Sequence, residues 1–250
     1  MFIFSIIIAF FMYLAMVIIN ILANTLPFNN MTTGEVSLKY PNLFQPSSVT
    51  FSIWGIIYLL LLIYLIYQVS LIKNVPNSKK DKYTKVNYLF AITSLLNISW
   101  IFAWHFDYIF LSVIIIILLL VTLILITRFT LTLDSFTRST FSIYTGWVSI
   151  ATIANITVFL VKAGVGSYGT LAVILTIVVL LVGLLISCLW ILKNKDVDYG
   201  IVVFWAYCGI LIRHMSKKEL NLAYPSIYIT VIISLFVLLL TNLYVIKKSK

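Results

Sequence analysis

The chain has 250 residues, of which 62% are hydrophobic and 10% are charged, and its mean hydropathy is +1.12. A soluble domain is nearer half apolar and a quarter charged, and its core could not hide this much apolar surface from water. The composition therefore excludes soluble globular, disordered, collagen-like and disulfide-rich secreted proteins, and it predicts that lipid surrounds most of the chain. The net charge of +10 lies in short clusters beside apolar runs, which is typical of a topology signal and not of a nucleic-acid-binding surface.

Eight apolar segments follow one another along the chain. A membrane-crossing helix needs about 20 apolar residues, and the predicted spans are residues 2–23, 49–69, 86–104, 108–127, 141–161, 168–192, 199–212 and 226–246. The seventh segment is short enough to be re-entrant, which would leave seven crossings. Asp198 and Arg213 lie at its two ends and favour a thin crossing, because both side chains can reach a membrane surface. The predicted fold class is all-α, a polytopic membrane helix bundle.

The basic residues predict the orientation of this bundle. With eight crossings both termini lie on one side, and twelve of the 17 Lys and Arg residues fall on that side and five on the other. With seven crossings the C-terminus changes sides, and the count on the side of the N-terminus stays twelve to five. Because basic residues accumulate in cytoplasmic loops, the N-terminus is predicted to be cytoplasmic. Residues 73–85 are interpreted as a basic loop on that side. Frequent Ile, Asn and Lys fit an AT-rich bacterial genome, so the predicted location is a bacterial plasma membrane.

The connecting segments carry few chemical motifs. Residues 24–48 contain three prolines and Gly34, which predict defined turns, and the segment is either a lid over a site or a simple connector. Residues 164–169 match GxGxxG, but they join two apolar helices and not a strand and a helix, so a turn is predicted. Asp196 and Asp198 are expected in a solvated turn. No metal-ligand cluster or catalytic motif stands out in the sequence, so no metal or catalytic residue is predicted.

Three of the spans carry aromatic and carboxamide side chains at helical spacing. In the fifth span four such positions fall within an arc of about 80°, at about 100° per residue. Asparagine facing lipid would lack partners, so the asparagines are expected to point into the bundle. The candidate ligand-binding residues are Pro46, Trp54, Tyr58, Asn97, Trp100, Tyr144, Trp147, Ala151 and Asn155. They predict an aromatic cleft for a flat or rigid apolar ligand, and the alternative is ordinary helix packing with the asparagines as polar glue.

These positions resemble the translocator-protein family, the tryptophan-rich sensory proteins (TspO/MBR). The second helix of that family has Pro, then Trp eight residues later, then Tyr four after that; its third has Asn and then Trp three on; its fifth has Tyr, Trp, Ala, Thr and Asn in one register. The matching residues are Pro46, Trp54 and Tyr58, then Asn97 and Trp100, then Tyr144, Trp147, Ala151, Thr152 and Asn155. The sequence departs from the family at Phe51 and Ser52, where Gly and Pro are usual, and at Ile156, where animal members have a sterol-motif Tyr.

The resemblance implies a division of the chain and a function. Residues 1–162 would form the five-helix core of the family, and residues 163–250 a transmembrane extension without a counterpart in it. Family members bind porphyrin, haem or, in animals, sterols inside the bundle, under the loop between their first two helices, and they often dimerise. The resemblance therefore implies a receptor or carrier for a tetrapyrrole-like or other flat hydrophobic ligand, with membrane lipid, the ligand and a second copy as partners and no nucleic acid.

Two other functions stay open on sequence alone. One is a permease or transporter subunit, although the chain has no phosphate-binding loop, internal repeat or mid-span proline. The other is an enzyme that modifies the ligand, such as a porphyrin-degrading one. No Asp, Glu or His lies well inside a predicted span, so the sequence leans against catalysis.

Overall fold

The protein is a bundle of long antiparallel helices. The computed structural model describes residues 1–26 and 28–249, without the side chains of Asn74 and Ser249; Pro27, one of the prolines of the predicted lid, lies outside the described residues. This part of the chain has two 3₁₀ turns, η1 (Phe28–Asn30) and η2 (Ser48–Ser52). Its α-helices are α1 (Phe2–Thr25), α2 (Thr33–Lys39), α3 (Ile53–Asn74), α4 (Asn77–His105), α5 (Ile109–Thr130), α6 (Ser135–Lys162), α7 (Thr170–Asn194), α8 (Val197–Met215) and α9 (Pro225–Ser249).

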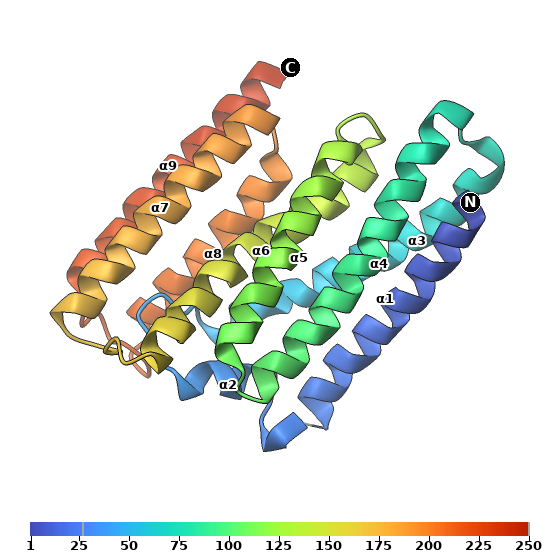
Figure 1. Cartoon of the computed structure of the whole chain (residues 1–250). Coiled ribbons are helices and arrows are strands. Elements are labelled where there is room, and N and C mark those ends of the chain that lie inside the picture. The colour runs from blue at the N-terminus through green and yellow to red at the C-terminus, as the bar shows by residue number, and fades with distance from the viewer. Residues whose placement is uncertain (27, 250) are drawn as a thin grey trace.

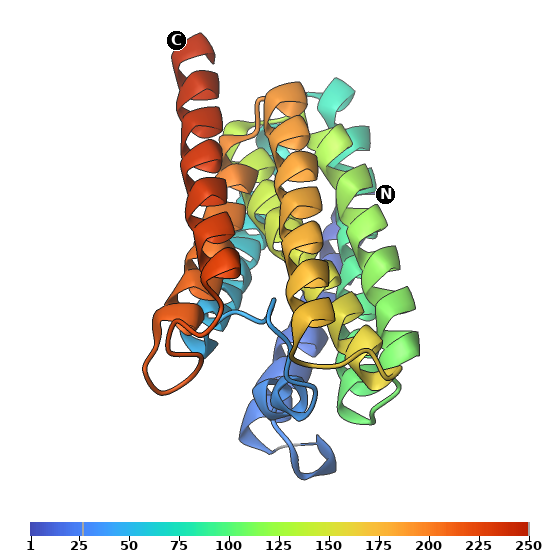
Figure 2. The ribbon, with the colours of Figure 1, turned by 90° about the vertical axis from the view of Figure 1, so that its left-hand side faces the viewer.

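Seven of these helices are long and apolar enough to cross a membrane, namely α1, α3, α4, α5, α6, α7 and α9. Their outward faces carry many exposed Ile, Leu and Phe side chains, as expected where lipid is the solvent. The chain is therefore an integral membrane protein, and the all-α bundle predicted from the sequence is confirmed. Both termini lie at one end of the bundle, and α2 lies at the other (Figures 1 and 2).

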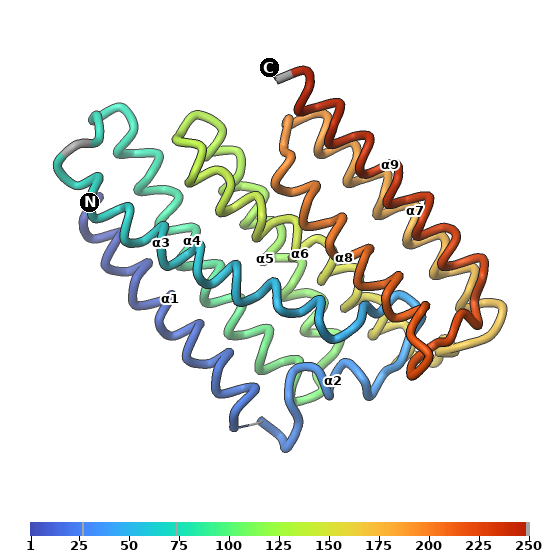
Figure 3. Tube along the Cα trace, turned by 180° about the vertical axis from the view of Figure 1, so that it is seen from behind, coloured from blue at the N-terminus to red at the C-terminus, as the bar shows by residue number. Residues whose placement is uncertain are grey.

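The helices pack in an order that differs from their order in the chain. Close contacts join α1 to α4, α4 to α5, α5 to α6, α6 to α8, α8 to α9 and α9 to α7. Helix α3 lies across α1 and α6, behind the other helices in the view of Figure 1 and in front of them in Figure 3. The chain between α1 and α3, which includes α2, covers the bundle end opposite to the termini.

Helix α8 is the segment predicted to be a thin crossing or a re-entrant loop. It is one continuous helix of 19 residues that carries Asp198, Arg213 and His214 and is not among the seven long apolar helices. At its start, Asp196 accepts a hydrogen bond from Ser142 near the beginning of α6, at 2.9 Å. At its other end, the carbonyl of Gly209 accepts a hydrogen bond from the backbone N–H of Ser47 in the lid, at 3.0 Å. The helix therefore runs from one end of the bundle to the other, which fits eight passages of the chain.

Two predicted connections were wrong. Residues 77–85 of the expected basic loop form the first turns of α4, because a Lys-rich segment is a good helix former once Pro76 has started the helix. Asp196 is not in a solvated turn: its side chain is buried and caps the N-terminus of α8 through the backbone N–H of Tyr199. The predicted turn at residues 164–169 is confirmed, and Gly164 and Gly169 have φ of 97° and 94°, which favour glycine.

Candidate functional site

An enclosed chamber lies under the lid, between α3, α4 and α6. Its volume is about 60 Å³, room for about four water molecules. The described side chains that line it are uncharged: Thr33, Ser37, Asn42, Gln45, Pro46, Phe51, Trp54, Trp100, Trp104, Trp147, Ile150, Ala151, Ala154, Asn155 and Val158. Four tryptophans thus surround a space that the lid closes from above.

A larger groove adjoins this chamber on the side of α1. It has a volume of about 590 Å³ and lies between α1, α3, α4 and the start of the lid. The side chains of Thr33, Phe51, Trp54 and Trp100 line both spaces. These four residues are therefore the wall between the enclosed chamber and the open groove.

The rings of the wall pack mainly edge to face. Trp54 lies at the centre: it stacks on Tyr58 at 5.5 Å between ring centroids and meets the edge of Trp147 at 6.1 Å. Phe51 contacts Trp147 at 5.8 Å with an interplanar angle of 86°. Phe51 lines both spaces, so its ring lies between them. Such contacts bring large apolar surfaces together without a hydrogen bond between the rings.

Polar groups without a partner gather behind these rings. The indole N–H groups of Trp100 and Trp147, the Nδ2 of Asn97 and the hydroxyl of Tyr144 are buried without a hydrogen-bond partner. Leaving such a group unpaired costs about 1–3 kcal/mol. Only the two indole N–H groups belong to residues that line the chamber, where they can donate to a ligand, and Gln45 Oε1, which also lacks a partner there, can accept from one.

The two asparagines of the site point into the bundle, as predicted. Asn97 Oδ1 accepts a hydrogen bond from Asn20 Nδ2 of α1 at 2.7 Å. Asn155 Oδ1 accepts one from the hydroxyl of Ser112 in α5 at 2.8 Å. Each carboxamide therefore joins two helices, and packing explains part of its role.

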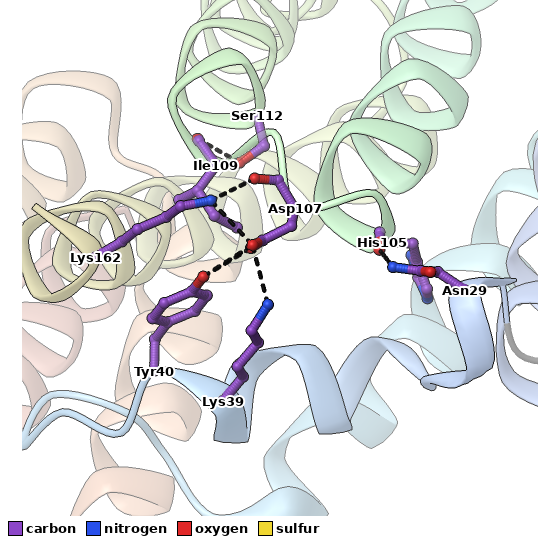
Figure 4. Close-up of polar contacts among 8 residues, drawn as sticks. All are labelled: Asn29, Lys39, Tyr40, His105, Asp107, Ile109, Ser112 and Lys162. Carbon is purple, nitrogen blue, oxygen red and sulfur yellow. Dashed lines mark hydrogen bonds and ion pairs between the residues drawn. The ribbon is translucent and has the colours of Figure 1, made fainter.

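The lid is attached to α4 at its beginning. The indole N–H of Trp104 donates to the carbonyl of Thr33 at 3.1 Å, and His105 Nε2 lies 3.4 Å from the Thr33 hydroxyl. Asn29 Nδ2 donates to the His105 carbonyl at 3.1 Å (Figure 4). Helix α2 starts at a capping box, in which Thr32 and Glu35 satisfy each other's backbone N–H groups.

The middle of the lid is held by Asp107, in the turn between α4 and α5. Its carboxylate accepts hydrogen bonds from Lys39 Nζ at 2.9 Å and from the Tyr40 hydroxyl at 2.8 Å, and it lies 3.1 Å from Lys162 Nζ at the end of α6 (Figure 4). Partial burial works against ionisation of this carboxyl, but the hydrogen bonds from Lys39, Tyr40 and Lys162 outweigh it and lower the pKa of Asp107 below its usual 3.8. We call these four residues the Asp107 cluster.

The end of the lid is held by α8. Arg213 Nη1 donates to the carbonyls of Asn42 and Gln45 at 2.7 and 3.0 Å, and His214 Nε2 lies 2.9 Å from the carbonyl of Leu43. Both side chains are buried, at 7% and 0% exposure. We call Arg213 and His214 the α8 clamp.

Close backbone packing supports the clamp. A Cβ atom on Gly209 would overlap the side chain of Thr50, whose own Cβ would be 2.8 Å away. Trp205 Nε1 donates to the carbonyl of Thr50 at 3.1 Å. The 3₁₀ turn η2, which joins the lid to α3, therefore rests directly on α8.

Comparison with known proteins bears on this arrangement. A family model described as TSPO-like protein matches residues 6–244. The chain belongs to the TSPO-like protein family. No curated protein and no solved structure matches it. The resemblance inferred from the aromatic register in the sequence is thus confirmed.

The match to the TSPO-like family is longer than the resemblance seen in the sequence. It extends past residue 162 and takes in most of residues 163–250. The structure agrees with a match that extends past residue 162, because Arg213 and His214 of α8 hold the end of the lid. The boundary between a 1–162 core and a 163–250 extension stays a prediction.

The structure brings the nine predicted site residues of this TSPO-like chain close together. Six line the chamber: Pro46, Trp54, Trp100, Trp147, Ala151 and Asn155. Tyr58 lines the groove. Asn97 and Tyr144 are buried behind the wall and are not among the lining residues of either space.

Sequence reasoning missed several residues of the site. Phe51 lies three positions before Trp54, so helical spacing could have added it to the cleft. Asn42 and Gln45 enter the chamber from the lid, where no periodicity marks them. Arg213 and His214 act on the lid from about 170 positions further along the chain, and their local sequence carries no signal for this.

Proposed function

We propose that the protein is a membrane receptor or carrier for a flat, mostly apolar ligand that bears hydrogen-bond acceptors. The observation that carries this proposal is the pairing of aromatic walls with two buried indole N–H groups that lack partners, those of Trp100 and Trp147, which both line the chamber. A ligand edge with oxygen or nitrogen acceptors would satisfy these groups, and aromatic faces would contact its plane. A porphyrin or haem fits this chemistry and is the ligand class implied by the resemblance to TspO proteins.

The size of the chamber requires that the wall opens on binding. Ligand pockets usually measure about 300–1,000 Å³, and the chamber measures about 60 Å³. The neighbouring groove, at about 590 Å³, is in the usual range. We propose that the ligand enters from the groove, and that rotation of Phe51 and Trp54 joins the two spaces around it.

The lining also favours a bound ligand that is neutral where it enters the chamber. A charge buried there would find uncharged neighbours among the described lining residues. A molecule with charged substituents would keep them in the groove or under the lid, where water and polar groups are close. We therefore propose that the neutral ring system of the ligand lies inside the chamber and that its polar substituents stay outside the chamber.

Titration of the purified protein with a porphyrin tests the proposal. Saturable quenching of tryptophan fluorescence is expected, because Trp54, Trp100, Trp104 and Trp147 surround the site. The Trp147→Phe variant removes one donor and part of the chamber lining, and it should weaken binding about tenfold or more. Trp54→Ala should weaken it further, because Trp54 contacts three other rings.

Trp190→Phe is the matched control. Trp190 stacks on Tyr199 and donates to Asp196, away from both cavities. Its loss should change the total fluorescence but not the affinity. Quenching that does not saturate, or that weakens equally in Trp147→Phe and Trp190→Phe, would contradict the proposal.

We also propose a bacterial plasma-membrane location with a cytoplasmic N-terminus. The positive-inside rule supports it, since the basic clusters around residues 73–85, 128–138 and 193–195 lie at the bundle end that carries both termini. Reporter fusions after residues 76 and 166 should give opposite locations, cytoplasmic for the first and external for the second. The reverse pattern would overturn the orientation.

A further inference from the structure

A second groove lies at the bundle end that carries both termini, away from the aromatic chamber. It has a volume of about 620 Å³ and runs along the ends of α7 and α9. Its lining residues are Leu192, Lys195, Leu240, Thr241, Tyr244, Val245 and Lys248. Apolar side chains thus line most of it, and two lysines lie at the ends of the helices.

The groove is graded from apolar to basic along its length. Leu240 and Lys248 are eight residues apart on one face of α9, which corresponds to about 12 Å along the helix axis. Leu192 and Leu240 are about half exposed, so this apolar surface faces lipid or a ligand and not other side chains. Tyr244 lies between the two regions, and Lys248 Nζ lies 5.7 Å from the centre of its ring.

The charge of the groove has no acidic counterpart. The ion pairs found among the described residues involve Asp107, at the opposite end of the bundle. The carboxylates next to Lys195 in sequence are engaged elsewhere: Asp196 accepts from Ser142 and Trp190, and Asp198 accepts from Ser139. Lys193 and Lys247 add further positive charge on the same two helix ends.

We propose that this groove binds one anionic phospholipid, with its phosphate between Lys195 and Lys248 and an acyl chain along Leu192 and Leu240. Basic pockets between helices at a membrane surface attract anionic headgroups, and each lysine adds to the attraction. The apolar part of the groove distinguishes a lipid from a free anion, because a soluble anion has no acyl chain to contact Leu192 and Leu240. The hydroxyl of Tyr244 can donate to an ester or phosphate oxygen, whereas the hydroxyl of Thr241 already donates to the carbonyl of Val237 at 2.8 Å.

The test compares spin-labelled phosphatidylglycerol with spin-labelled phosphatidylcholine on the full-length protein in bilayer discs. We expect a clear preference for phosphatidylglycerol. The double variant Lys195→Gln/Lys248→Gln should reduce this preference by about 30-fold, the effect of two lysines at an anionic surface. The variant Leu240→Trp fills the apolar part without changing the charge, and it should also lower the fraction of immobilised phosphatidylglycerol.

The matched control is Lys193→Gln/Lys247→Gln, which removes the same charge from the same helix ends but leaves the groove lining intact. It should retain most of the preference. An equal loss in both double variants would overturn the proposal in favour of a diffuse surface charge. Displacement of the lipid by millimolar inorganic phosphate would overturn it in favour of a free-anion site, and immobilisation of a sterol without preference for phosphatidylglycerol would overturn it in favour of a sterol groove.

Discussion

Two of the three attachments of the lid over the aromatic chamber, those to Asp107 and to α8, differ in their physics. The Asp107 cluster is an ion-pair network at the surface, in which the side chains of Lys39 and Asp107 are 45% and 32% exposed. The α8 clamp is a buried cation, Arg213, that donates to two backbone carbonyls and is only 7% exposed. Exposed ion pairs are worth about 0–1 kcal/mol and weaken with salt, whereas a buried acceptor that loses its donor costs about 1–3 kcal/mol.

The difference indicates how the lid can move. The half that contains α2 has a partly buried contact, between Thr33 and Trp104, and is otherwise attached mainly through the exposed Asp107 cluster, where water can replace the contacts. The half from Asn42 to Thr50 is attached to α8 through contacts that water cannot easily reach. Opening should therefore begin at α2, while residues 42–50 stay on α8. Three substitutions test this difference, from the largest expected effect to the smallest.

Replacing Arg213 should have the largest effect. Arg213→Leu leaves the carbonyls of Asn42 and Gln45 without their donor, so we expect a loss of about 3 kcal/mol in the free energy of unfolding. This corresponds to a fall of about 6–12 °C in the thermal unfolding midpoint. Porphyrin affinity should also fall, because the lid residues that line the chamber lose their support.

Arg138→Leu is the control for this prediction. Arg138 also donates to two backbone carbonyls, those of Asn194 and Lys195, but at the end of the bundle far from the lid. It should lower the unfolding midpoint without changing ligand affinity. Equal changes in affinity for the two variants would show that the α8 clamp has no special relation to the site.

Adding a methyl group at Gly209 should have an intermediate effect. Gly209→Ala places a Cβ against Thr50, and the resulting overpacking should cost about 1–3 kcal/mol. Thr50→Gly in the same chain removes the overlapping atoms and should restore part of the lost stability. If the double variant is no more stable than Gly209→Ala alone, α8 does not press on the lid at this point. A thermal unfolding series in one detergent provides the measurement.

Removing the charge of Asp107 should have the smallest effect on stability. Asp107 has φ of 64°, a conformation that Asn tolerates well, so Asp107→Asn changes the charge with little strain. We expect a fall of at most about 1 kcal/mol at low salt, and no difference from the unmodified protein at 1 M salt.

The pH dependence follows from the lowered pKa of Asp107. The cluster stabilises the folded state fully above the usual pKa of 3.8, and the contribution disappears as the pH falls through the lower folded-state pKa. The protection of α2 amides from hydrogen exchange, measured relative to the intrinsic exchange rate at each pH, should therefore decrease below about pH 4 in the unmodified protein. The Asp107→Asn variant should show the faster exchange already at pH 7, and slow exchange there would contradict the role of the cluster.

Much of the fold can be predicted from the sequence, because the length of the apolar runs decides it. Runs of about 20 apolar residues leave few options other than membrane helices, and the eight predicted segments each lie in a helix of the bundle. The basic segment after Pro76 was misread because polarity was taken to mean a loop, whereas lysines are compatible with a helix. Helix α2 was missed although Thr32 and Glu35 have the spacing of a capping box.

The candidate site, like the fold, could be predicted from the sequence only in part. Trp54, Trp100 and Trp147 were predicted because each lies at helical spacing from another aromatic or asparagine residue of its own helix and matches a known register. The α8 clamp was not found because its partners are backbone carbonyls, which any residue supplies and no side-chain pattern reveals. Asp196 was misplaced for a related reason, since burial of a carboxylate depends on donors such as Ser142 and Trp190 that only the fold brings near.

The small volume of the closed chamber has a consequence for the rate of binding. A chamber of about 60 Å³ must widen before a ring system can enter, so only the open fraction of molecules is competent to bind. The apparent dissociation constant is then the intrinsic one divided by that fraction. The observed association rate should level off at high ligand concentration, at the rate at which the wall of Phe51 and Trp54 opens.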